Sequence, residues 1–142
     1  MGTDIQWRRA GEEQQVPDIV VHNTMGNIVF DKLKSDTRDR INYDIYRFSV
    51  MGPDPFIFYR FFAPPFKHKY NRRSTTMHTT HTGEFFVEIA KRAKINADDN
   101  LFSYLAGFLC HYALDGDAHP YVNMLASNDV NRHRAIEKRL DQ

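Results

Sequence analysis

The sequence is poor in cysteine and lacks both a long apolar run and an excess of charge of one sign. Its single cysteine, Cys110, excludes an internal disulfide and favours a cytoplasmic protein. No segment approaches the roughly 18 consecutive apolar residues of a membrane-spanning helix, so we expect a soluble chain. Lysine and arginine total 19 against 18 aspartate and glutamate residues, which leaves no overall field to attract nucleic acid or an anionic membrane.

The N-terminal sequence MGTDIQWRRAGEEQQ has no apolar segment of the kind that forms the core of a signal peptide. We therefore interpret residues 1–16 as a polar tail. As written, the chain is expected to be cytoplasmic, or secreted if a leader has been removed. The length of 142 residues fits one domain with its own core, and we assign residues 17–142 to it.

Apolar residues recur at helical spacing through most of this domain, and no internal repeat or β-hairpin signal accompanies them. The predicted fold class is all-α, a compact multi-helix bundle. Within the second helix, Ile41, Ile45, Phe48 and Val50 are expected to face the core. The predicted helices cover residues 17–33, 36–52, 54–62, 81–94, 101–115 and 128–142.

Two prolines mark expected helix boundaries. Asp54 stands before Pro55, where it could simply cap a short helix. Pro120 is expected to end the central apolar helix, because the residue before a proline is disfavoured in helical geometry. His119 is therefore predicted to lie on the corner that follows this helix.

Histidines and carboxylates occur at spacings that suit a metal site between the helices. His111 and Asp115 are four residues apart, so they face the same way on a helix, and His133 and Glu137 repeat that spacing. One such pair arises easily by chance, whereas two pairs on consecutive helices with His119 between them do not. Burying these groups is unfavourable unless a partner such as a metal ion binds them. Upstream candidates are His22, Asp54 and His78.

The order of these motifs is informative. The segments VVHNTMGNIVFDKL, GPD and MHTTHTGEFF carry the upstream candidates, LCHYALDGDAHP contains an HYxxD motif followed by a histidine, and HRAIE contributes His-x-x-x-Glu. In this order they resemble the zinc-dependent phospholipase C family, from about Asp18 to the end of the chain. The resemblance implies an all-helical fold shared with the S1/P1 nucleases and a cleft that holds zinc ions.

The resemblance also implies a ligand set. One zinc ion would be bound by Asp54, His78, His111 and Asp115, and a second by His119, His133 and Glu137. A third would be bound by His22, with Asp115 as a bridging ligand. Asp54 would also orient or deprotonate the attacking water. Secreted members complete the third site with an N-terminal tryptophan, whereas Trp7 lies inside this chain, so either Asp18 replaces it or the site is empty or filled by water. His81 competes with His78 for one role, and we prefer His78.

The implied activity is hydrolysis of phospholipids to diacylglycerol and a phosphorylated head group by metal-activated water, with two or three zinc ions as cofactors. The alternatives are an S1/P1-like nuclease and a non-catalytic helical module stabilised by metal. We expect no obligate protein partner. The aromatic stretch FIFYRFFAPPF beside the basic KHKYNRR could make transient contact with a membrane surface, although such stretches more often belong to a core. Because the family usually continues through further helices, we expect a fragment or a reduced form of the fold.

Overall fold

The structure is a computed structural model that describes residues 19–58, 76–78, 80–127 and 129–140. These residues are largely helical and contain no strand, which confirms the predicted all-α class. None of the described helices combines the length and the apolar composition needed to cross a membrane. The helices are α1 (Ile19–Lys32), α2 (Ser35–Arg38), α3 (Tyr43–Ser49), α4 (Pro55–Phe58), α6 (Thr82–Asn96), α7 (Asp99–Ala126) and α8 (Val130–Leu140).

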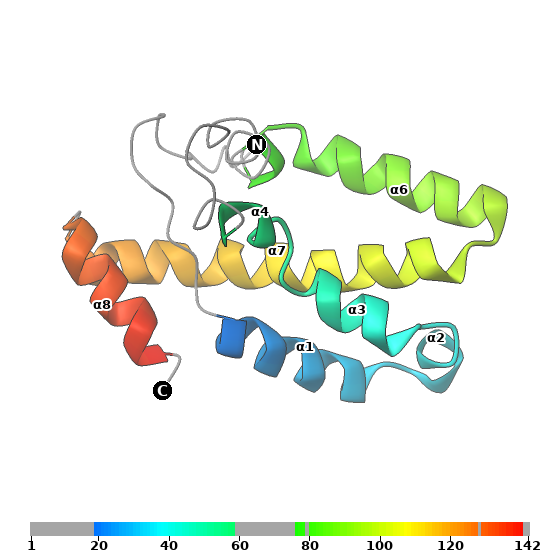
Figure 1. Ribbon diagram of the computed structural model, residues 1–142, viewed down its shortest axis with the longest axis horizontal. Coiled ribbons are helices and arrows are strands. Elements are labelled where there is room, and N and C mark those ends of the chain that lie inside the picture. Colours follow the sequence, from blue (N-terminus) through cyan, green and yellow to red (C-terminus); the bar gives the residue numbers. More distant parts are fainter. Residues whose placement is uncertain (1–18, 59–75, 79, 128, 141–142) are drawn as a thin grey trace, which may run out of the picture.

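Helix α7 is the centre of the bundle. Figure 1 shows it running along the molecule, with α6 on one side, α1 and α3 on the other, and α8 across its C-terminal end. The same four helices pack against it. Side chains on α7 can therefore meet side chains from both halves of the sequence. Residues 1–16 and most of the aromatic and basic stretch lie outside the described residues.

Helix α7 is longer than the sequence predicted. The carboxylate of Asp98 caps its start by accepting from the backbone N–H groups of Asn100 and Leu101, both at 3.0 Å. The expected end near His119 was wrong, because the helix continues through Pro120 to Ala126. Val122 and Ala126 are almost fully buried, so their packing outweighs the local preference against helix before a proline. His119 consequently lies one helical turn beyond Asp115.

The single helix predicted over residues 36–52 is two helices, α2 and α3. The break allows Asn42 to cap α3, where its side chain accepts from Ile45 N–H, and it turns Ile41 into the core. Tyr46 and Val50 complete this core cluster. Phe48 was expected to face inward but is 61% exposed, because the break changes the face that α3 presents to α7.

Helix α3 lies close against α7 because Gly107 has no side chain. A Cβ atom there would collide with the Ser49 hydroxyl and the Tyr46 carbonyl, and it would lie 3.0 Å from the Val50 nitrogen. Nearby, the fully buried Ser103 hydroxyl accepts a hydrogen bond from Asn42 N–H at 2.8 Å. This close approach brings the turn after α3 against the face of α7 that carries His111.

Candidate metal centre

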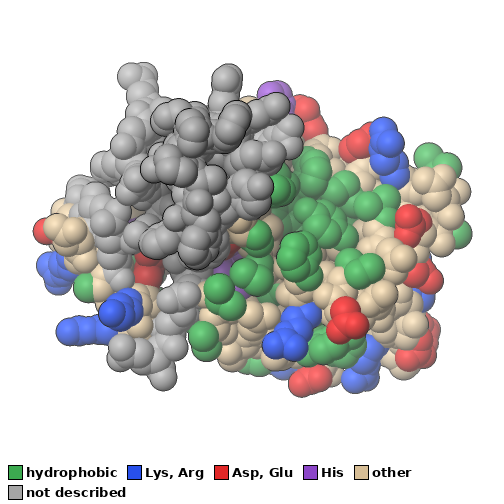
Figure 2. All heavy atoms as spheres, viewed as in Figure 1, with side chains coloured by type: hydrophobic (Ala, Val, Ile, Leu, Met, Phe, Trp, Pro, Cys, Tyr) green, Lys and Arg blue, Asp and Glu red, His purple; other side chains and the backbone are tan. Residues whose placement is uncertain are grey.

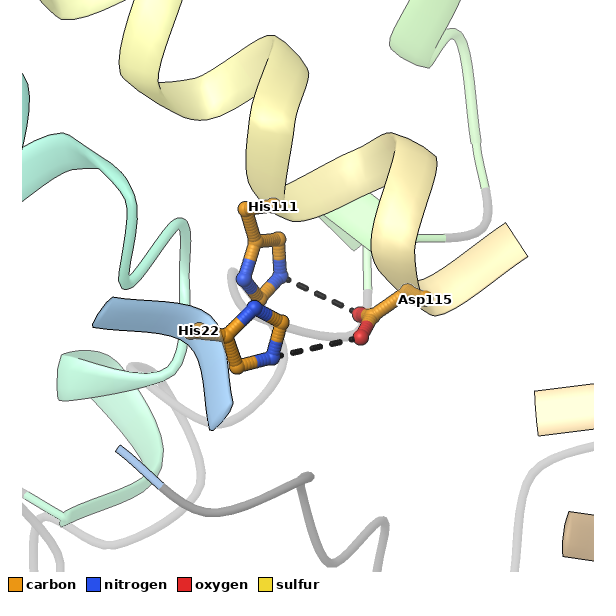
Figure 3. Close-up of side chains that lie close together, drawn as sticks. All are labelled: His22, His111 and Asp115. Atoms are coloured by element: carbon orange, nitrogen blue, oxygen red, sulfur yellow. Dashed lines mark ion pairs between the residues drawn. The ribbon is translucent and has the colours of Figure 1, made fainter. Parts of the chain in front are cut away.

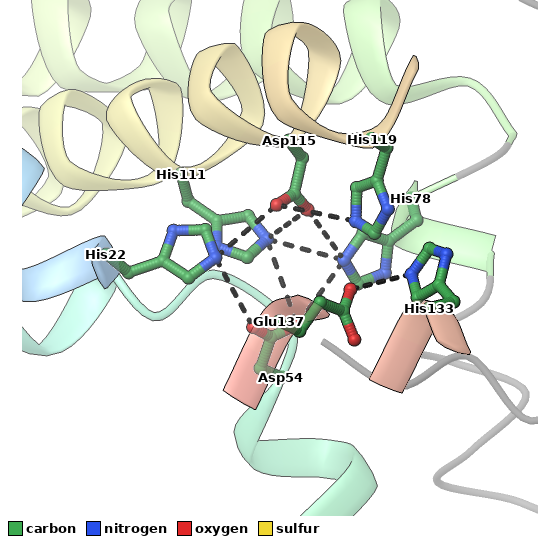
Figure 4. Close-up of polar contacts among 8 residues, drawn as sticks. All are labelled: His22, Asp54, His78, His111, Asp115, His119, His133 and Glu137. Atoms are coloured by element: carbon green, nitrogen blue, oxygen red, sulfur yellow. Dashed lines mark hydrogen bonds and ion pairs between the residues drawn. The ribbon is translucent and has the colours of Figure 1, made fainter. Parts of the chain in front are cut away.

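Eight of the residues selected from the sequence converge beside α7 (Figure 4). They come from α1, from the turn before α4, from the helical residues 76–78, and from α7 and α8. Within the described part of the chain, three groups bring their ligand atoms to within 4.8 Å of one another. The groups are His22, His111 and Asp115; Asp54, His78 and His111; and His119, His133 and Glu137.

The first two groups share His111 and form one buried cluster of five residues. Their exposed fractions are 0% for His111, 1% for His22, 2% for Asp115, 3% for Asp54 and 6% for His78. Two carboxylates and three imidazoles are thus removed from water together. Burial of such groups is unfavourable unless strong partners compensate for the lost hydration.

Asp115 lies close to all three imidazoles of this buried cluster, and Figure 3 shows its pairs with His111 and His22. Its Oδ2 is 3.2 Å from His111 Nε2 and 3.5 Å from His78 Nε2, and its Oδ1 is 3.4 Å from His22 Nε2. Most of these separations are longer than those of good hydrogen bonds. They match the edge of a tetrahedron of ligands, because bonds of about 2.0–2.1 Å to one zinc ion place neighbouring donors about 3.3 Å apart.

Asp54 completes the buried cluster from the turn before α4. Its Oδ1 is 3.4 Å from His78 Nε2 and 3.8 Å from His111 Nε2. The two Nε2 atoms are themselves only 3.3 Å apart. Both imidazoles therefore direct the same nitrogen into one small space that two carboxylates also face.

Several polar atoms in the buried cluster have no partner in hydrogen-bonding geometry. They are both ring nitrogens of His22, Nδ1 of His111, and Oδ1 of Asp54 and of Asp115. Buried polar atoms are nearly always hydrogen-bonded in folded proteins, so this concentration indicates a missing ligand. Imidazole nitrogens and carboxylate oxygens are donors that zinc accepts. The residues present therefore fit a bound zinc ion.

Burial and charge shift two pKa values in opposite directions. Burial opposes a charge on His78, but the close carboxylates of Asp115 and Asp54 outweigh burial and raise the pKa of His78 to about 9. Burial would raise the pKa of Asp115, yet the close imidazoles of His111, His22 and His78 hold it well below its usual range. Without metal, His78 therefore carries a proton at neutral pH beside an ionised Asp115.

The third group is more open and joins α7 to α8. His133 Nε2 lies 2.7 Å from Glu137 Oε1, and the His119 and His133 rings stack with centroids 5.7 Å apart. The side chains of His119 and His133 are each 19% exposed, against 5% for Glu137. His119 Nε2 is also 3.8 Å from Asp115 Oδ1, so Asp115 links this group to the buried cluster.

The structure separates the two histidines that competed for one role. His78 points into the buried cluster, whereas the side chain of His81 is 70% exposed and pairs with Glu84 at 3.0 Å. His81 also has a φ of 57° at the start of α6, and this turn separates its direction from that of His78. Asp18, the residue suggested to complete a third site, lies outside the described residues.

The geometry can be compared with known proteins. Neither the curated proteins nor the solved structures gave a match to this chain. The family model described as zinc dependent phospholipase C matches residues 21–142. That match covers most of the chain and includes all eight residues of the three groups. The chain therefore belongs to the zinc-dependent phospholipase C family.

Proposed function

We propose that this protein hydrolyses phosphodiester bonds in phospholipids, releasing diacylglycerol and a phosphorylated head group. The observation that carries the proposal is the buried cluster, which meets a more open histidine and glutamate group at Asp115. Family membership supports hydrolase chemistry with zinc. A purely structural zinc site needs only four ligands, so eight converging donors favour an enzyme over a metal-stabilised module.

The proposed ligands form sets around two or three ions. The first ion would be held by Asp54, His78, His111 and Asp115, and a third by His22 with Asp115 as a bridge. His111 occurs in both buried groups, and we assign it to the first ion because its Nε2 is 3.3 Å from His78 Nε2. The second ion would be held by His119, His133 and Glu137.

The chemistry divides between the ions and the chain. Zinc, when bound, is a Lewis acid that brings the pKa of a coordinated water near neutrality and stabilises charge on phosphoryl oxygens. Asp115 holds three imidazoles in orientation through its two oxygens. Asp54 is the proposed catalytic residue, because its buried carboxylate lies beside the proposed ligand nitrogens and can orient an attacking water or accept its proton. The partly exposed His119 and His133 leave this side of the centre open to solvent.

A paired substrate assay tests the proposal. Zinc-loaded protein is incubated with phospholipid vesicles and, separately, with single-stranded DNA and RNA, and the released head group, diacylglycerol and nucleotides are quantified. Release of phosphorylated head group that is lost in Asp54→Asn supports the proposal. Cleavage of nucleic acid alone would favour the nuclease alternative. Bound zinc with no turnover of either substrate would favour the other alternative, a non-catalytic module stabilised by metal.

Zinc is expected to stabilise the protein more as pH rises. In the metal-free chain the pKa of His78 is raised from 6.5 to about 9, so its contribution to stability is complete below 6.5 and is lost as pH rises through 9. The lowered pKa of Asp115 gives a contribution that is present above 3.8 and is lost as pH falls. The metal-free cluster therefore contributes most to stability between pH 3.8 and pH 6.5. Zinc binding, in contrast, requires His78 without its proton.

Thermal unfolding with excess zinc and with chelator measures this difference. The zinc-induced rise in Tm should be clearly larger at about pH 8.5 than at about pH 6, because fewer protons compete for His78. An equal rise at both pH values would contradict a metal-binding role for His78. The exposed His81, which lies outside the cluster, provides the control: His81→Ala should keep the pH dependence of the wild type.

A further inference from the structure

We propose that Gly52 is a positioning residue of the buried cluster, because its missing side chain leaves the space that the His111 imidazole occupies. The helix predicted over residues 36–52 ends at this glycine. In the structure it lies in the turn that joins α3 to α4, two residues before Asp54. The inference rests on the zinc ligation proposed above.

The contact between Gly52 and His111 leaves no room for a side chain. A Cβ atom built on Gly52 would lie 2.5 Å from Cγ and 2.6 Å from Nε2 of His111, and closer still to Cδ2. Cβ atoms in proteins essentially never approach another atom to within 3.0 Å. The imidazole therefore packs directly against the backbone of the turn.

The imidazole of His111 cannot easily move away. The residue is 0% exposed, and the His22 ring stacks on it with a centroid distance of 4.3 Å and an interplanar angle of 26°. Phe108 lies one helical turn back on α7, with its ring centroid 6.0 Å from that of His111. Rotation of the imidazole would carry Nε2 away from Asp115 Oδ2, which is 3.2 Å away. A side chain at position 52 would therefore displace Nε2 of His111, the nitrogen that is proposed to bind the metal.

The same glycine shapes the turn that carries Asp54. Its φ is +53°, a region that residues with a side chain rarely adopt. In this turn Gly52 N–H donates to the Ser49 carbonyl at 2.8 Å, and Asp54 N–H donates to the Met51 carbonyl at 3.2 Å. Gly52 therefore sets the position of two proposed ligands of one ion, His111 by contact and Asp54 through the backbone.

The test compares Gly52→Ala with two other glycine variants. At Gly26 a Cβ atom would press on the Val50 side chain at 2.7 Å, and its three nearest atoms all belong to Val50, whereas at Gly116 it would meet nothing within 4 Å. Each protein is loaded with cobalt(II), and its visible absorption, metal content and affinity are measured. For Gly52→Ala we expect a changed spectrum and an affinity at the buried cluster reduced by about tenfold or more, with the His119 group still loaded. Gly26→Ala and Gly116→Ala should keep the wild-type spectrum.

The outcomes separate this inference from the proposed function. Wild-type protein that binds no metal would overturn both. Metal-bound wild type with an unchanged spectrum in Gly52→Ala, or with equal changes in Gly26→Ala, would overturn the positioning role alone. A double-variant comparison covers the case in which Gly52→Ala folds poorly: in metal-free protein, Gly52→Ala should lower Tm less when His111 is already alanine. An equal loss of Tm in both backgrounds would assign the effect to backbone strain and overturn the proposal.

Discussion

Asp115→Asn is expected to abolish the proposed hydrolysis and to remove metal from the buried cluster. The carboxylate faces four imidazoles, those of His22, His78, His111 and His119, at Nε2 to oxygen distances of 3.2–3.8 Å. Asparagine has the size of aspartate but no charge. Its NH2 group would also face the imidazoles, where the carboxylate had presented an acceptor. Removing one partner of a buried charge set costs about 3–5 kcal/mol. At about 1.4 kcal/mol per factor of ten, zinc affinity should fall by about 10² to 10³-fold or more.

Elemental analysis of protein purified without added metal measures this loss directly. Wild type is expected to carry two or three zinc ions per chain, and the variant fewer, with residual metal on His119, His133 and Glu137. Asp117→Asn is the matched control, because Asp117 lies on the same helix two residues away with an exposed side chain. Equal zinc content in wild type and Asp115→Asn would refute the central role of this carboxylate.

Part of the site was predictable from the sequence because helical spacing is local. His111 and Asp115, and likewise His133 and Glu137, are one turn apart, so helix formation alone places each pair on one face. The convergence of the upstream candidates could not be obtained this way. They lie on three separate segments whose packing around α7 is tertiary, and only the resemblance to a family indicated that convergence.

The errors in the predicted fold arose where local preference and packing disagree. Pro120 disfavours helix at His119, yet the burial of Val122 and Ala126 holds the helix continuous. This difference matters for the site, because it places His119 four residues after Asp115 on a shared face rather than on a corner. The pattern over residues 36–52 looked like one helix because nothing in its periodicity shows that Asn42 would cap a new one.

Removal of zinc is expected to release α8 from the rest of the bundle. Among the described side chains of this helix only Glu137 is buried, while the apolar side chain of Leu140 is 53% exposed. The helix has 11 residues, and isolated helices shorter than about 12–15 residues are marginal in water. Apolar packing by the described residues therefore contributes little to its position.

A metal ion at the third group would instead connect the two helices. His119 comes from α7, whereas His133 and Glu137 come from α8, so one ion on all three joins the helices. A ligand present at about 100 times its dissociation constant stabilises the bound form by about 2.7 kcal/mol, which corresponds to about a 100-fold change in population. Trypsin cleavage at Lys138 and Arg139, both exposed on α8, should accelerate by up to about this factor when zinc is chelated.

Two variants show whether this protection depends on the proposed bridging ion. His133→Ala removes one of its proposed ligands and should be cut at the chelated rate even with zinc present. His22→Ala removes a histidine of the buried cluster that comes from α1 and is not in the group with residues of α8, so it should keep zinc-dependent protection. Equal cleavage of wild type with and without zinc would mean that other contacts hold α8. Protection that is lost in His133→Ala and kept in His22→Ala would locate the effect at the ion between α7 and α8, because among the three groups of the described residues only this one combines residues of both helices.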